Sequence, residues 1–181
     1  MPSPDASSNK PRVLIIGIGN DHRHDDAVGL TAARRLRARK LPRITIVEAT
    51  GEGTALMEFW QNADTVILLD AVQSGAAPGT IHRLDACNQT VHTSFLRCST
   101  HALGVAEAIE LARALNRLPP RLLVLGIEGR DFTPGSGLSL EVEDALPVLL
   151  KTVTQDMASL GPTAVKPTAD DDRPTNWRTR Q

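Results

Sequence analysis

Two acidic residues and one histidine in this chain have the types and positions that could hold a divalent metal ion. Asp26 follows the glycine-rich turn GIGN, Asp70 follows an apolar run, and His101 begins a helix-like stretch. Two carboxylates and one imidazole suit a divalent transition metal, and the set is too poor in nitrogen to resemble a structural zinc site. A histidine near a helix N-terminus is favoured in its neutral form, which can bind a metal. We therefore expect a metal-binding, catalytic site built from Asp26, Asp70 and His101.

Each of these residues also has a simpler interpretation. One member of the acidic pair that contains Asp26 could merely cap the following helix. Asp70 could hydrogen-bond the next loop, and His101 could be an ordinary polar residue of a first helical turn. His22 and His24 are the alternative imidazole ligands, because their backbone lies beside Asp26 in the sequence.

The glycine turn does not fit a dinucleotide-binding fingerprint. Gly17 and Gly19 are followed by His22 where the third glycine of G-x-G-x-x-G should stand. The paired aspartates that follow would oppose binding of a pyrophosphate at the helix N-terminus. The sequence therefore argues against a nucleotide site.

Alternating strand-like and helix-like segments must position the candidate site. Apolar, β-branched runs predict the strands, and helical periodicity predicts the helices between them. This alternation predicts a three-layer, doubly wound α/β sandwich with a mostly parallel sheet of about five strands. The carboxyl ends of such strands meet at one edge, where ligands bind, so Asp26, Asp70 and His101 can converge. We expect strands at 13–16, 44–48, 65–69, 80–84 and 121–127, with the 80–84 strand at an edge. We expect one helix at 27–39, a second that begins after a Thr54 cap, a third from Ser99 or Thr100 to 116, and a fourth that begins after a Ser139 cap.

Composition sets the broad class of the protein. With 181 residues, 41% of them hydrophobic, the chain can bury one core, and we expect one domain at 12–161 between flexible ends at 1–11 and 162–181. A net charge of −1 and few aromatic residues argue against nucleic-acid binding. Neither a membrane-spanning run nor the apolar core of a signal peptide is seen, so we expect a cytoplasmic protein.

The sequence has no conventional protease motif. It contains neither a G-x-S-x-G elbow nor an H-E-x-x-H helix. Cys87 and Cys98 lack metal-ligand spacing, and neither has a histidine partner that the sequence can assign. A cysteine nucleophile is therefore disfavoured.

The chain contains, in this order, the segments GIGNDHRHDDAVG, TGEGTALMEFW, LLDAVQSGAAPGT and STHALGVAEAI. The first, third and fourth segments resemble three ordered motifs of the hydrogenase maturation endopeptidases, and the second matches the glycine-rich segment between the first two motifs. These enzymes remove the C-terminal extension of the large subunit of nickel-iron hydrogenases after nickel has been inserted. The resemblance extends from about Arg12 to Leu160, and the family's metal-binding positions fall on Asp26, Asp70 and His101.

The resemblance implies an endopeptidase whose partner is a nickel-loaded large-subunit precursor. Nickel would come with the substrate and serve as the recognition element. The chain departs from the family pattern in two ways. Asp26 takes a place held by glutamate in some relatives. The DHRH loop is more polar than the usual loop, which leaves a direct role open for His22 or His24. The alternatives are an α/β binding module that senses a metal or ligand, and a hydrolase that carries its own metal.

Overall fold

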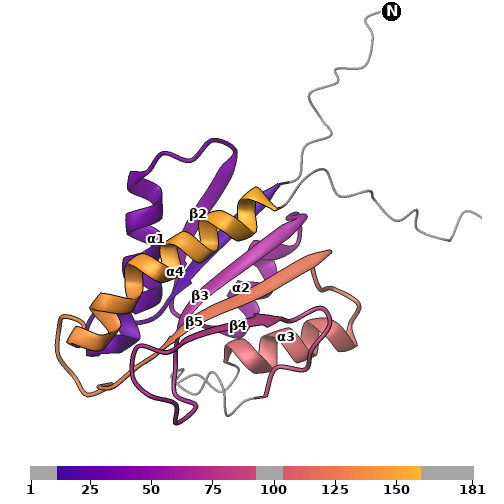
Figure 1. Cartoon of the computed structure of the whole chain (residues 1–181). Coiled ribbons are helices and arrows are strands. Elements are labelled where there is room, and N and C mark those ends of the chain that lie inside the picture. The colour runs from indigo at the N-terminus through magenta and orange to yellow at the C-terminus, as the bar shows by residue number, and fades with distance from the viewer. Residues whose placement is uncertain (1–11, 93–103, 160–181) are drawn as a thin grey trace, which may run out of the picture.

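The computed structural model describes residues 12–92 and 104–159, which form a five-stranded sheet between two layers of helices (Figure 1). The strand order is β2-β1-β3-β5-β4, and all neighbours are parallel except β4, which runs antiparallel to β5 at one edge. The predicted α/β class, the mostly parallel sheet and the edge position of the 80–84 strand are confirmed. The strands are β1 (Val13–Ile18), β2 (Ile44–Ala49), β3 (Thr65–Val72), β4 (Ile81–Asp85) and β5 (Arg121–Glu128).

Within the described residues, two helices cover each face of the sheet. Side chains alternate across a strand, so neighbouring residues of β1 pack into different cores. Ile15 packs with α1 and α4 on one face, whereas Leu14 and Ile16 pack with α2 and α3 on the other. The helices are α1 (Val28–Ala38), α2 (Gly53–Trp60), α3 (Val105–Ala114) and α4 (Leu140–Ala158), with a short 3-10 turn, η2 (His24–Ala27), before α1.

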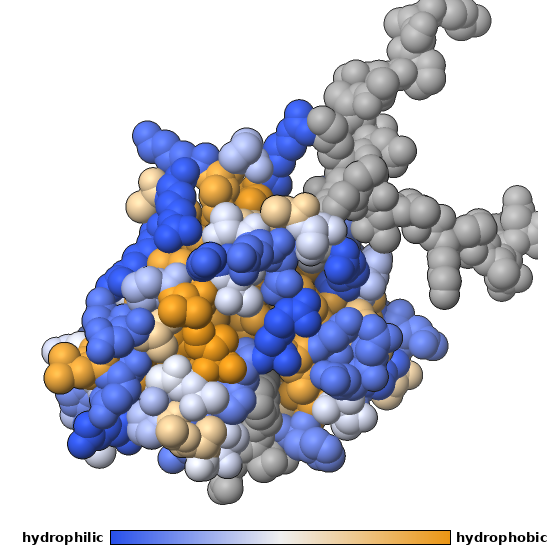
Figure 2. Space-filling model, in the orientation of Figure 1, coloured by the Kyte–Doolittle hydropathy of each residue, from blue (hydrophilic) through white to orange (hydrophobic). Residues whose placement is uncertain are grey.

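The central strand β3 is buried along its whole length. This burial explains its uninterrupted apolar run, because helices cover both faces of a parallel sheet. The outer faces of the helices are polar, and Figure 2 shows hydrophilic residues over much of the face on which α1 and α4 lie. None of the described helices is long and apolar enough to cross a membrane.

The connections reverse direction between β1 and β3. The chain leaves β1 for β2 on one side and then crosses to β3 on the other. In open α/β sheets this reversal of direction opens a ligand-binding crevice. Asp26, in η2, and Asp70, in β3, are both carried by elements at this point.

The glycines of the first motif let α1 pack directly on the sheet. A Cβ atom on Gly29 would lie 2.2 Å from the carbonyl oxygens of both Ile18 and Leu69. A Cβ atom on Gly17 would lie 2.4 Å from the carbonyl oxygen of Gly29. The motif therefore serves close helix–sheet packing.

Three of the predicted caps and boundaries are wrong for reasons that the structure shows. Glu52 is the N-cap of α2 in place of Thr54, because the Glu52 carboxylate accepts the backbone N–H groups of Thr54 and Ala55. Asp70 does not end its strand, since β3 continues to Val72 through pairing with β5. The third helix starts at Val105, because Gly104 has an extended backbone at φ −86° and ψ −169°.

The start of the last helix is confirmed, with Ser139 as the N-cap of α4 and Pro147 inside the helix. His101, Cys98, Ser99 and Thr100, together with the expected flexible ends, lie outside the described residues.

Candidate active site

Asp26 is a buried carboxylate at the end of the glycine loop. Its residue is only 5% exposed, within η2. Burial raises the pKa of Asp26 to about 6, although the positive charge of Arg23 lowers it. Arg23 is itself held in place, because its guanidinium donates hydrogen bonds of 3.2 and 3.1 Å to the carbonyl oxygen of Phe132.

Asp70 is the second buried carboxylate, and it lies on β3 beside Gly126 of β5. The pKa of Asp70 is raised to about 8, mainly by burial. The hydrogen bond from the backbone N–H of Ala71 lowers this pKa, and the negative charge of Asp26 raises it further. That N–H donates a 2.8 Å hydrogen bond to Oδ1 of Asp70. The structure thus brings Asp26 and Asp70 close enough for their charges to interact.

The two carboxyl groups differ in protonation near neutral pH. With pKa values of about 6 and about 8, Asp26 is mostly ionised at pH 7 while Asp70 is mostly protonated. A pair of this kind offers one proton acceptor and one proton donor, as acid–base sites with separated pKa values do. A divalent cation between them would favour the ionised form of both.

Asp25, the other member of the acidic pair, has a structural role. It is fully buried, and its carboxylate accepts hydrogen bonds from the backbone N–H groups of Arg130, Asp131 and Ser139 at 2.8, 2.9 and 2.7 Å, and from the Ser139 hydroxyl at 2.9 Å. Neither aspartate caps α1, whose N-cap is Ala27 without a side-chain hydrogen bond. The helix-cap interpretation of the pair is therefore wrong.

The polar DHRH loop packs against the connection between β5 and α4. The Nδ1 atom of His24 lies 3.1 Å from the carbonyl oxygen of Gly137. The same ring lies against Gly135, where a Cβ atom would be 1.9 Å from Nε2. His22 is exposed. Among the residues that the structure describes, no three histidine, cysteine or acidic side chains could together hold a metal ion, so His22 and His24 do not complete a site with the two aspartates.

Glu128 is a buried acidic residue that the sequence analysis did not single out. It accepts hydrogen bonds from the Ser74 hydroxyl and the Gly75 N–H, each at 2.8 Å, and its Oε2 lies 3.1 Å from Nε2 of His82. Burial raises the pKa of Glu128, but these hydrogen bonds together bring it below its usual value. Its role is to anchor the β3–β4 connection, and the only signal in the sequence is a charge that directly follows an apolar strand.

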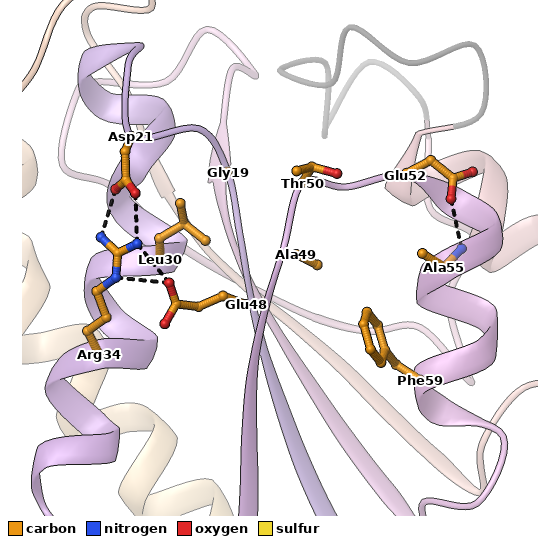
Figure 3. Close-up of a pocket in the computed structure, with 10 residues that line it drawn as sticks. All are labelled: Gly19, Asp21, Leu30, Arg34, Glu48, Ala49, Thr50, Glu52, Ala55 and Phe59. Carbon is orange, nitrogen blue, oxygen red and sulfur yellow. Dashed lines mark hydrogen bonds and ion pairs between the residues drawn. The ribbon is translucent and has the colours of Figure 1, made fainter.

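A surface pocket of about 380 Å³ lies beside the site, at the carboxyl end of β2 and between α1 and α2 (Figure 3). Its lining includes Gly19, whose backbone touches the site loop: a Cβ atom there would lie 1.8 Å from the carbonyl oxygen of Asp26. The pocket therefore adjoins the backbone of Asp26. The lining residues are Gly19, Asp21, Leu30, Arg34, Glu48, Ala49, Thr50, Glu52, Ala55 and Phe59.

The structure is an α/β fold with two electrostatically coupled carboxyl groups at the carboxyl edge of its sheet. Comparison with known sequences identifies its family. The profile described as hydrogenase maturation protease matches residues 30–156. The chain belongs to this family and is a peptidase.

Individual relatives agree along most of the chain. The hydrogenase 2 maturation protease of Escherichia coli K12 is 31% identical over 160 residues, which cover 85% of this chain and 95% of the relative. The hydrogenase expression/formation protein HupD of Rhizobium leguminosarum bv. viciae is 27% identical, over 89% of this chain and 81% of the relative. Among solved structures, the hydrogenase maturating endopeptidase HybD of E. coli aligns with a TM-score of 0.69 and 26% identity, covering 83% of this chain and 94% of that one.

Proposed function

We propose that this peptidase removes the C-terminal extension of a nickel-iron hydrogenase large-subunit precursor once nickel has been inserted. Family membership supports the kind of partner, because the relatives are named for hydrogenase maturation. The observation that carries the proposal is the pair of buried, electrostatically coupled carboxyl groups, Asp26 and Asp70. Burying two such groups close together is costly, and that cost is typical of a functional site.

Nickel enters this proposal as part of the substrate. A cation that arrives with the precursor would relieve the repulsion between Asp26 and Asp70 and draw the proton from Asp70. The apposed carboxylates would then hold the precursor only when its metal centre is filled. Metal insertion would thereby become the condition for cleavage.

His101 is proposed as the third ligand, on the resemblance between STHALG and the family's histidine motif. It stands shortly before α3, whose N-cap is Gly104. With His101, the set would supply two oxygens and one nitrogen, which suit nickel. Nickel could polarise the scissile carbonyl or lower the pKa of a bound water, and Asp26 could accept the proton of that water.

The decisive experiment compares nickel-loaded with nickel-free large-subunit precursor. The unaltered enzyme should shorten only the loaded precursor, as seen by a gel shift and by mass spectrometry of the released peptide. Asp26→Ala should abolish processing while keeping a native circular dichroism spectrum. Asp144→Ala, which removes an exposed carboxylate on α4, is the matched control and should process normally.

Four outcomes would contradict parts of this proposal. Normal processing by Asp26→Ala would remove that residue from the site. Equal cleavage of nickel-free precursor would exclude nickel as the recognition element. Binding of the loaded precursor without release of a peptide would identify a binding module, and cleavage that requires metal added to the enzyme would identify a hydrolase with its own metal.

A further inference from the structure

The polar DHRH loop carries an arginine, Arg23, between its two histidines, and the proposed reaction gives this arginine no role. Arg23 is half-buried and is the N-cap residue of η2. Its carbonyl oxygen accepts the backbone N–H of Asp26 at 3.0 Å, so the two residues lie one turn apart. A guanidinium is always charged, so a permanent positive charge belongs to the same turn as the buried carboxyl group of Asp26.

The backbone of Arg23 is fixed by the connection between β5 and α4. Arg23 forms a β-bridge with Gly135. The N–H of Gly135 donates to the carbonyl oxygen of His22 at 2.9 Å, and the N–H of His24 donates to that of Gly135 at 3.3 Å. His24 has a φ of 42°, which few residues other than glycine adopt, and its ring packs against Gly135. These contacts fix the backbone from which the Arg23 side chain extends.

The guanidinium of Arg23 is fixed as well. Its Nε and Nη2 atoms donate hydrogen bonds of 3.2 and 3.1 Å to the carbonyl oxygen of Phe132. That carbonyl is itself held in place, since the Phe132 ring packs against the core and the N–H of Asp131 binds the buried carboxylate of Asp25 at 2.9 Å. A guanidinium has five N–H donors, and most of them remain for another acceptor.

Arg23 acts on Asp26 through its charge without pairing with it. The positive charge of Arg23 lowers the pKa of Asp26, yet no ion pair or hydrogen bond joins the side chains of these two described residues. The bonds to Phe132 hold the guanidinium apart from the carboxyl group. Its remaining donors are therefore kept for a ligand, close to the group that is proposed to accept a proton.

Hydrolysis of a peptide bond creates a negative charge that needs such donors. When water attacks the carbonyl carbon, an electron pair of the C=O bond moves onto the oxygen, and the proton of the water passes to Asp26. The oxyanion then re-forms the carbonyl as the C–N bond breaks, and Asp26 gives its proton to the leaving nitrogen. Donors that are fixed before the reaction stabilise an oxyanion most effectively, because they need no reorganisation.

We propose that Arg23 is a further catalytic residue, whose guanidinium donates to the carbonyl oxygen of the bond that is cut and stabilises the oxyanion. This step rests on the proposed function for the reaction itself. Within the loop, His24 is a positioning residue, because its contacts with Gly135 hold the backbone of Arg23. The ligand of Arg23 is a main-chain oxygen, so Arg23 does not select the side chains of the substrate.

Kinetics with nickel-loaded precursor tests the role of the charge. Glutamine and lysine at position 23 can each still donate to the Phe132 carbonyl, but only lysine keeps the positive charge. Arg23→Gln should lower kcat on the order of 100-fold, with KM unchanged or lower. Arg23→Lys should recover about tenfold of this loss. A normal kcat in Arg23→Gln, or equal losses in the two variants, would overturn the proposal.

A pH series separates the proposed role from an effect on Asp26 alone. If Arg23 served only to keep Asp26 ionised, Arg23→Gln would regain full activity as the pH rises from 6 to 9. We expect the loss in kcat to persist over this range, and full recovery at pH 9 would contradict the proposal. The matched control is Arg35→Gln, which removes a partly exposed guanidinium of α1 that pairs with Glu143. It should keep a normal kcat, and a loss as large as that of Arg23→Gln would exclude a specific role for Arg23.

Cadmium binding to the full-length protein gives a readout that needs no cleavage. Arg23→Gln should bind cadmium a few-fold more tightly than the unaltered protein, because a positive charge beside Asp26 opposes a cation. Equal affinities would show that the guanidinium does not act on the carboxyl pair, and would overturn the proposal. If the unaltered enzyme and Arg23→Gln cut the precursor equally well, only the role of Arg23 fails. If the unaltered protein cuts no precursor, the proposed function fails, and the step assigned to Arg23 fails with it.

Discussion

The negative charge of Asp26 raises the pKa of Asp70, although the two residues belong to different elements, η2 and β3. Burial is the larger cause for both, and the pKa values rise to about 6 and about 8 from the ordinary 3.8. Between about pH 4 and pH 8 the folded state therefore holds protons that the unfolded state releases. The contribution of these protonated groups to the free energy of unfolding is therefore fully present below pH 4. It is lost as the pH rises through 6 and 8.

Asp70→Asn should therefore stabilise the protein at high pH while abolishing its activity. The amide keeps an oxygen that can accept the Ala71 N–H, and it carries no charge to desolvate. We expect the free energy of unfolding at pH 8 to rise by roughly 2–4 kcal/mol, with the gain shrinking toward pH 4. Urea unfolding at several pH values measures this. Asp144→Asn, on the exposed face of α4, should show no such gain; a similar rise there, or none in Asp70→Asn, would contradict the assignment.

Asp25 and Asp26 should respond in opposite ways to replacement by alanine. Asp25→Ala would leave the N–H groups of Arg130, Asp131 and Ser139 without the buried carboxylate that accepts their hydrogen bonds. Its free energy of unfolding should fall by about 3 kcal/mol or more, because each unsatisfied donor is costly. Asp26→Ala should keep or increase stability, since it removes a buried carboxyl group with a raised pKa. Thermal unfolding of the two variants distinguishes them, and equal losses would show that Asp26 also has a structural role.

Metal binding to the isolated protein should release protons. Nickel, or cadmium or zinc in its place, should bind weakly, and Asp70→Asn or His101→Ala should remove most of this binding. With the pKa of Asp70 at about 8, a metal that binds its carboxylate at pH 7 must displace a proton. The affinity should then rise by at most about tenfold per pH unit between pH 6 and pH 8. Calorimetry in two buffers of different ionisation enthalpy counts the protons. Binding without proton release, or undiminished in Asp70→Asn, would place the metal elsewhere.

The sequence predicted the features that depend on a local pattern of residues. It did not predict the features that depend on contacts between segments far apart in the chain. Apolar runs located all five strands, and the order of elements was enough to bring Asp26 and Asp70 to one edge. The sequence did not show that Asp25 has a structural role whereas Asp26 lies in the candidate site. The donors that bind Asp25 belong to residues 130–139, which are remote in the chain. Glu128 was missed for the same reason, since its partners lie on the connection before β4 and on β4.

The starts of two helices were predicted at the wrong residue because more than one nearby residue could cap each helix. Thr54 and Glu52 are both able to cap a helix, and the longer glutamate side chain reaches two N–H groups of α2 at once. At α3, the extended backbone of Gly104 separates the helix from the Ser-Thr pair that looked like a cap. The sequence contains both possible caps in each case, and only the backbone geometry chooses between them.

Gly29→Ala tests whether the first motif works through close packing. A Cβ atom at this position would meet the carbonyl oxygens of Ile18 and Leu69, both backbone atoms of central strands that cannot rotate away. Alanine favours a helix more than glycine does, by up to about 1 kcal/mol, so helix propensity alone predicts a more stable protein. We expect the steric clash to outweigh the gain in helix propensity, because α1 would have to move off the sheet. The free energy of unfolding should fall by roughly 2–4 kcal/mol.

Thr31→Ala provides the matched control for this variant, since it makes a comparable change of helix propensity on the same helix away from the sheet carbonyls. It should be neutral or slightly stabilising in the same thermal and urea unfolding experiments. Gly29→Ala should also disturb the site, because the shifted helix carries η2 and Asp26 with it. Its processing of precursor should fall even at temperatures where it remains folded. A Gly29→Ala protein as stable and as active as Thr31→Ala would show that the glycine is not needed for packing.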